Sequence, residues 1–145
     1  MTTFRKLTDD FYVAPQLDKA DFAEAAAMGI RTVINNRPDG EAPDQLSDEA
    51  AAALADAHGL AYAHVPVVSG NLRPEDIALM RAAIAGNDGP FLAYCRSGTR
   101  SCHLWALAEA ASGEPDRLIE TAARAGYDLH GMRPFLEELR QRGGS

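Results

Sequence analysis

Six consecutive residues in the second half of the chain carry groups that can bind and attack an anionic substrate. The run begins with the thiol of Cys95 and ends with the guanidinium of Arg100. Gly98 can adopt a positive φ angle, so the loop can curl until its backbone N–H groups point toward one centre. The amides expected to line this centre belong to Arg96, Ser97, Gly98, Thr99 and Arg100. Such a ring binds an anion, and Cys95 is placed to act on it.

The residues around this loop predict a strand before it and a helix after it. Phe91 to Tyr94 form an apolar run behind Pro90, and apolar residues recur at helical spacing from Leu104 onward. Cys95 would therefore lie at the carboxyl end of a strand, where open parallel sheets bind ligands, and beside a helix N-terminus, which favours anions. Cysteines in such surroundings ionise readily and act as nucleophiles. The alternative is an inert buried cysteine.

Further residues near the expected strand tips bear on the chemistry. Arg37 follows a predicted strand and could point its guanidinium at the loop to draw the anion inward; alternatively it is solvated or pairs with Asp39. The hydroxyl of Ser101 could bond to the Cys95 sulfur; alternatively Ser101 is an ordinary polar residue in the first turn of the helix. Cys102 is expected to pack in the core, with a resolving thiol as the other reading. Neither a metal nor another cofactor is predicted, because no His or carboxylate cluster has metal-ligand spacing.

The run Cys-Arg-Ser-Gly-Thr-Arg resembles the active loop of rhodanese sulfurtransferases, in which the cysteine carries sulfur as a persulfide. Taken with residues 33–41 and 64–67, it resembles a bacterial family with a dual-specificity-phosphatase-like fold, usually described as sulfur transferases or phosphatase-like proteins. The resemblance extends over nearly the whole chain and implies a single domain over residues 1–145. In some members this domain is fused to a metallo-β-lactamase-like hydrolase or persulfide dioxygenase, which implies a partner of that kind.

Two departures from the phosphatase pattern favour sulfur transfer. Tyrosine-phosphatase-like enzymes have five residues between the Cys and the Arg, whereas four separate Cys95 from Arg100. The missing residue removes up to about 3.5 Å of contour from the ring. Those enzymes also take a general acid from an Asp on a neighbouring loop, and residues 65–72 contain no carboxylate. Losing such an acid costs a phosphatase about 100- to 10,000-fold in rate, while transfer between thiolates needs none.

We therefore expect a rhodanese-like sulfurtransferase. The Cys95 thiolate would take the outer sulfur from a small anionic donor, thiosulfate or glutathione persulfide, and pass it to an acceptor thiol. Arg100 and the loop amides would hold the anion, and Arg96 would recruit it. The main alternative is a cysteine-dependent phosphatase of the tyrosine or dual-specificity type, with Asp39 or Asp76 as its acid. A noncatalytic, regulatory anion-binding module is the third reading.

Alternating strand and helix patterns predict the architecture that positions these residues. Strands are expected over residues 4–7, 11–13, 31–35, 60–67 and 91–94, and helices over 18–28, 47–58, 74–85, 100–112, 115–125 and 132–142. This order predicts an α/β domain of three layers, with a mostly parallel central sheet covered by helices on both faces. The family resemblance implies the topology of the cysteine phosphatases.

The composition limits the classes of binding partner and the cellular compartment that we expect for this chain. A chain of 145 residues with a net charge of −7 is long enough for one hydrophobic core and is too acidic for a general affinity for nucleic acid or anionic membranes. Residues 1–13 lack the apolar run of a signal peptide, and the chain has only two cysteines. A cytoplasmic protein without a disulfide framework is expected.

Overall fold

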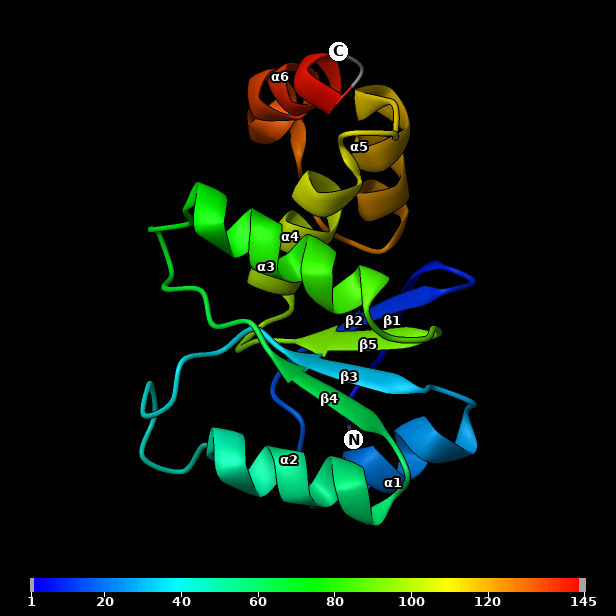
Figure 1. Ribbon diagram of the computed structural model, residues 1–145, viewed down its shortest axis with the longest axis vertical. Coiled ribbons are helices and arrows are strands. Elements are labelled where there is room, and N and C mark those ends of the chain that lie inside the picture. The colour runs from blue at the N-terminus through cyan, green and yellow to red at the C-terminus, as the bar shows by residue number, and fades with distance from the viewer. Residues whose placement is uncertain (1, 144–145) are drawn as a thin grey trace.

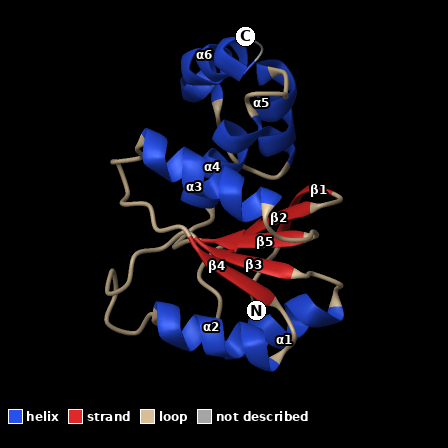
Figure 2. Ribbon diagram, viewed as in Figure 1, coloured by secondary structure: helices blue, strands red, loops and turns tan. Residues whose placement is uncertain are grey.

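The computed structural model describes residues 2–143 and shows a five-stranded sheet between layers of helices (Figures 1 and 2). The strands are β1 (Arg5–Thr8), β2 (Phe11–Ala14), β3 (Thr32–Asn35), β4 (Ala61–His64) and β5 (Phe91–Tyr94). Their order in the sheet is β1-β2-β5-β3-β4. Only β1 runs antiparallel to its neighbour, so the predicted mostly parallel sheet is confirmed.

Helices cover both faces of the sheet, as predicted. They are α1 (Lys19–Ala27), α2 (Asp48–Ala57), α3 (Pro74–Ala85), α4 (Thr99–Glu109), α5 (Pro115–Arg124) and α6 (Arg133–Gly143), with a 3₁₀ turn, η1, at His130–Met132. In Figure 1, α1 and α2 lie below the sheet and α3 and α4 above it, while α5 and α6 stack beyond α4. Two hydrophobic clusters, one on each side of the sheet, form the core.

Local capping explains where several helices begin. Asp18 accepts a hydrogen bond from the Asp21 N–H, and the Asp21 carboxylate accepts one from the Asp18 N–H, which is a complete capping box for α1. The Ser47 hydroxyl accepts from the Ala50 N–H at 3.1 Å and caps α2. Side chains of these types satisfy N–H groups that the first turn of a helix leaves unpaired, so these starts were predictable from sequence.

The fourth strand is shorter than predicted. It ends at His64 rather than at residue 67. Pro66 has no N–H to donate to a neighbouring strand, and the segment after it turns away toward α3. The last residues of the parallel strands, Ala14, Tyr94, Asn35 and His64, are aligned in one row. The loops that follow them therefore meet at one edge of the sheet, on the left in Figure 1.

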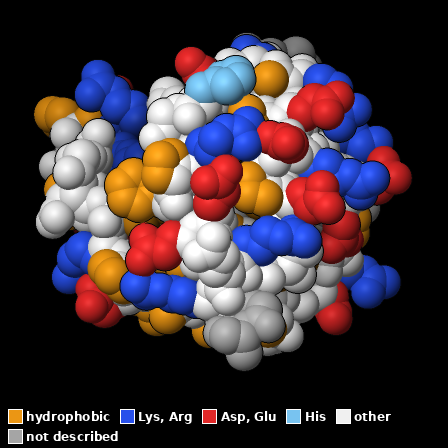
Figure 3. Space-filling model, turned by 90° about the horizontal axis from the view of Figure 1, so that it is seen from above, with side chains coloured by type: hydrophobic (Ala, Val, Ile, Leu, Met, Phe, Trp, Pro, Cys, Tyr) orange, Lys and Arg blue, Asp and Glu red, His pale blue; other side chains and the backbone are white. Residues whose placement is uncertain are grey.

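The surface seen from the α6 end carries interspersed acidic and basic side chains (Figure 3). Within residues 2–143, no helix is both long enough and apolar enough to cross a membrane.

Candidate active site

Cys95 lies directly after β5, at the edge where the loops meet, as predicted. Its N–H donates to the carbonyl of Ala14 at 3.3 Å, and the Gln16 N–H donates to the carbonyl of Arg96 at 3.3 Å. These two bonds attach the start of the loop to the segment that follows β2. Cys95 thus directly follows the central strand, β5, and is bonded to the end of β2 just before the first turn of α4.

Gly98 shapes the loop in the way the sequence predicted. Its φ angle is +91°, and it is the N-cap of α4. The Gly98 N–H donates to the Cys95 sulfur at 3.1 Å, so one loop amide points at the nucleophile. The Thr99 N–H instead lies 3.4 Å from the Ser97 hydroxyl, which in turn donates to the Thr99 hydroxyl at 3.0 Å. Ser97 and Thr99 therefore brace the outer side of the turn.

Arg100 contacts both the sulfur and the neighbouring loops. Its Nη1 donates to the carbonyl of Val67 at 2.7 Å and to Glu41 Oε2 at 2.7 Å, and its Nη2 donates to Glu41 Oε1 at 2.8 Å. The hydrogen bonds to Glu41, and further the charge of the nearby Cys95, raise the pKa of the guanidinium above its ordinary value. Arg100 is therefore a fixed positive charge beside Cys95, as expected.

Arg37 also lies at this edge of the sheet and binds the same carboxylate, that of Glu41. Its side chain is only 5% exposed, and its Nε donates to Glu41 Oε1 at 2.8 Å. Its Nη1 donates to Gln16 Oε1 at 3.0 Å, and its N–H donates to Asn35 Oδ1 at 2.9 Å. The predicted alternatives, a solvated side chain or a pair with Asp39, are wrong, because Glu41 takes that place. The hydrogen bond from Arg100, and to a smaller extent the one from Arg37, lowers the pKa of Glu41, although burial acts in the opposite direction.

Polar residues at the ends of β3 and β4 support the Arg37 backbone. His64 Nε2 lies 2.9 Å from the Arg37 carbonyl, and His64 Nδ1 lies 3.3 Å from Asp48 Oδ2. The Tyr62 hydroxyl donates to Asp48 Oδ1 at 2.6 Å and accepts from Asn35 at 3.1 Å. His64 thus supports the backbone of the Arg37 loop.

One expected contact is absent from the described residues, and another expected role is not tested. The Ser101 hydroxyl is buried but has no hydrogen-bond partner within residues 2–143, so the predicted bond to the Cys95 sulfur does not form. Arg96 is exposed, and its backbone carbonyl accepts from the Gln16 N–H. Its expected part in recruiting the substrate stays a prediction.

Both cysteines are buried. Cys95 has no solvent exposure, so the nucleophile is closed off in this conformation. Cys102 packs in the cluster that includes Leu104 and Met80. Burial, and secondarily the charge of Cys95, raise the pKa of the Cys102 thiol to about 12. Cys102 is therefore a core residue, in line with the first of its two predicted roles.

Neither of the predicted acids is free to donate a proton at the site. Asp76 is 1% exposed, and its carboxylate accepts from the Arg73 N–H at 2.9 Å and from Arg73 Nη2 at 3.3 Å at the start of α3. Asp39 accepts from the Asp48 N–H at 2.6 Å. Both carboxylates serve the loops and helix starts to which they belong.

Three residues at the site were not predicted. Glu41 belongs to a segment singled out in the sequence but was given no role, and Gln16 follows β2 at the same edge. The Tyr127 hydroxyl lies 3.4 Å from the Ser97 carbonyl, over the turn of the loop. Gln16 could have been predicted from its position, because it closely follows the end of a strand. Tyr127 had none, because it comes from the segment after α5, far along the chain.

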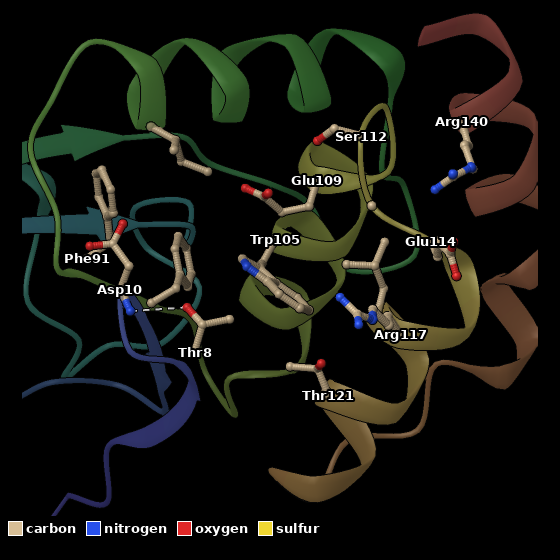
Figure 4. Close-up of a pocket in the computed structure, with 14 residues that line it drawn as sticks. Thr8, Asp10, Phe91, Trp105, Glu109, Ser112, Glu114, Arg117, Thr121 and Arg140 are labelled. Atoms are coloured by element: carbon tan, nitrogen blue, oxygen red, sulfur yellow. Dashed lines mark hydrogen bonds between the residues drawn. The ribbon is translucent and has the colours of Figure 1, made fainter. Parts of the chain in front are cut away.

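A cavity of about 670 Å³ lies at the opposite end of the sheet. Figure 4 shows its walls: Thr8 and Asp10 from the β1–β2 turn, Trp105 from α4, Arg117 from α5 and Arg140 from α6. It contains none of the predicted site residues. We place the candidate site at Cys95 because this thiol, the N-terminus of α4 and the guanidinium groups of Arg37 and Arg100 lie at the same edge of the sheet.

Comparison with known proteins gives the family of the domain. Residues 3–112 match the family described as "Beta-lactamase hydrolase-like protein, phosphatase-like domain". The chain is 39% identical over 127 residues to a beta-lactamase hydrolase-like protein of Xylella fastidiosa, covering 86% of this chain and 30% of that protein. This chain thus spans less than a third of the length of that relative.

Solved structures agree on the fold. A Neisseria meningitidis protein described as a "putative phosphatase" has a TM-score of 0.81 and 36% identity, over 94% of this chain and 97% of that one. Kinase-associated phosphatase, whose catalytic site contains a cysteine, has a TM-score of 0.71 at 14% identity, over 100% of this chain and 96% of that one. The predicted cysteine-phosphatase topology is confirmed.

The same comparison corrects the predicted activity. The family and the Neisseria relative are described as phosphatase-like and as a phosphatase, so the expected rhodanese-like sulfurtransferase is contradicted. The count of loop residues therefore gave a wrong prediction of the activity. Gly98 turns the chain with a positive φ, and α4 already begins at Thr99, so contour length alone does not set the opening of the ring. The chain belongs to the family of beta-lactamase hydrolase-like, phosphatase-like domains.

Proposed function

We propose that this domain is a cysteine-dependent phosphatase that hydrolyses phosphate monoesters at Cys95. The observation that carries the proposal is the placement of the Cys95 sulfur at the N-terminus of α4, where it accepts the Gly98 N–H at 3.1 Å beside the Arg100 guanidinium. Amides, a helix N-terminus and an arginine are the groups that stabilise the charge of a transferring phosphoryl group. Membership of a phosphatase-like family supports the same reading.

The chemistry would proceed in two displacements. The Cys95 thiolate attacks phosphorus, an S–P bond forms, and the P–O bond to the leaving group breaks with its electron pair on oxygen. A water molecule then attacks the phosphocysteine, breaks the S–P bond and releases orthophosphate, which regenerates the thiolate. The loop amides and Arg100 hold the phosphoryl oxygens through both steps, because negative charge remains on them throughout.

The leaving oxygen must be stable without a strong proton donor. Asp39 and Asp76 are engaged elsewhere, and Glu41 is held as an anion by two guanidinium groups. General acid catalysis is worth about 100- to 10,000-fold in rate. The proposed enzyme therefore acts best on esters whose leaving group is a weak base, such as aryl phosphates.

Hydrolysis of p-nitrophenyl phosphate tests the proposal. The wild-type chain should release phosphate, and Cys95→Ser should abolish the release while leaving the fold intact by circular dichroism. Cys102→Ala removes the other thiol and should retain activity, since Cys102 lies in the core. An inactive wild-type protein that still binds orthophosphate would refute the phosphatase and favour the noncatalytic module. The dioxygenase-type partner implied by the family resemblance stays a prediction.

A further inference from the structure

The cavity at the opposite end of the sheet from Cys95 combines an aromatic wall with unpaired charges (Figure 4). Its volume of about 670 Å³ falls in the range of about 300–1,000 Å³ that small-molecule sites have. Phe11 lines it together with Phe91, at a centroid distance of 5.8 Å, and with Trp105, at 6.4 Å. These side chains belong to the buried core. The wall is therefore a contiguous aromatic surface against which the ring of a ligand can pack.

Two arginines line the cavity without a counter-ion. Arg117 from α5 and Arg140 from α6 make no ion pair with any residue in the range 2–143. Nη1 of Arg140 is buried and has no hydrogen-bond partner in the same part of the chain. Glu114 also lines this end but is exposed and pairs with neither arginine. A buried cationic donor without a partner is costly, and a carboxylate would bind it by charge-assisted hydrogen bonds, so this end suits an anionic group.

Two carboxylates line the other end of the cavity. In Figure 4, Asp10 from the β1–β2 turn and Glu109 from the end of α4 lie on the opposite side of Trp105 from the two arginines. Neither carboxylate makes an ion pair with another of the described residues. Burial, and then the charge of Asp10, raise the pKa of Glu109 above its ordinary value. An ammonium group placed here would stabilise both carboxylates in their charged form.

We propose that this cavity binds a small aromatic zwitterion, a molecule whose aromatic body has a carboxylate at one end and an ammonium group at the other. The carboxylate pairs with Arg117 and Arg140. The aromatic body packs against Trp105, and the ammonium group lies at Asp10 and Glu109. A ligand without the ammonium group would face carboxylates that nothing neutralises, and a ligand without the carboxylate would leave the buried nitrogen of Arg140 unpaired.

Three small molecules test the proposal on the wild-type chain. Trp105 is the only tryptophan of the sequence, so its fluorescence reports binding in this cavity. The probe is 4-(aminomethyl)benzoate; 4-methylbenzoate keeps only its anion, and 4-methylbenzylamine keeps only its cation. The probe should give a saturable change, and each of the other two should bind about tenfold more weakly or worse, because each lacks one charge-assisted contact. Equal affinities, or no change with millimolar probe, would overturn the proposal.

Two variants assign each charge of the probe to its end of the cavity. Arg140→Gln should weaken probe binding by about tenfold and leave the binding of 4-methylbenzylamine unchanged. Glu109→Gln should weaken probe binding to a similar extent without weakening that of 4-methylbenzoate. Arg142→Gln removes the same charge from α6, at a side chain that is 74% exposed and outside the cavity, and should have no effect. Full probe affinity in a folded Arg140→Gln would refute the assignment, and the wild-type comparison decides the proposal if a variant fails to fold.

The same titration distinguishes this cavity from the Cys95 loop. No residue of the loop, 95–100, lines the cavity, so the inference does not rest on the proposed function. Arg100→Gln removes the guanidinium beside Cys95 and should leave the affinity for 4-(aminomethyl)benzoate unchanged. A loss of affinity in that variant would place the probe at the loop and overturn the proposal.

Discussion

Replacing Gly98 by alanine should destabilise the protein through two separable effects. At a φ of +91° a side chain costs about 1–2 kcal/mol. The added methyl group would also collide with the Tyr127 hydroxyl, and overpacking of this kind costs about 1–3 kcal/mol. A combined loss of about 3 kcal/mol lowers the Tm of a chain of this size by about 10 °C. The Gly98 amide would shift away from the Cys95 sulfur, so activity should fall as well.

Urea unfolding of the wild-type chain, Gly98→Ala, Tyr127→Phe and the double variant separates the cost of the backbone angle from the cost of the collision. Tyr127→Phe alone should be nearly neutral, because its hydrogen bond to the Ser97 carbonyl is long, at 3.4 Å. Added to Gly98→Ala, it should restore the part of the loss that comes from the collision and leave about 1–2 kcal/mol from the backbone angle. Full recovery in the double variant, or a Gly98→Ala protein as stable as wild type, would contradict the account of the loop.

Three further predictions follow from the site. Alkyl phosphates should react about 100- to 10,000-fold more slowly than nitrophenyl phosphate, because Asp39 and Asp76 are engaged elsewhere and Glu41 is paired with two guanidinium groups; equal rates would reveal a general acid. The pKa of Glu41 lies below its ordinary value of 4.5, so the stability that its ionisation provides is complete above pH 4.5 and is lost as the pH falls through the folded-state pKa. Urea unfolding of Glu41→Gln should lack this part of the acid sensitivity, and an unchanged pH profile would contradict the ion pairs. Cys102, with its pKa raised to about 12 by burial, should resist iodoacetamide at pH 8 in the folded protein and react in urea, as mapped by peptide mass spectrometry; rapid native labelling would place it outside the core.

Much of the fold was accessible from local patterns. The helix starts at Asp18 and Ser47 depend on side chains that bond to N–H groups within a few residues, and such bonds need no tertiary contact. The strands β3 and β5 are buried at all four positions because both of their faces are covered, and their central residues are apolar. The position of Cys95 followed from the same reasoning, since a strand leading into a helix places the intervening loop at the edge of a parallel sheet.

The sequence by itself thus indicated the candidate nucleophile, the turn at Gly98 and the arginine beside it, because these lie within six residues and local backbone geometry relates them. Only the tertiary structure decided what surrounds them. Glu41 meets Arg100 across 59 residues of chain, and Tyr127 reaches Ser97 across 30. Contacts of this kind depend on how strands and helices pack together, and no local pattern encodes which charged side chain will neutralise a given guanidinium.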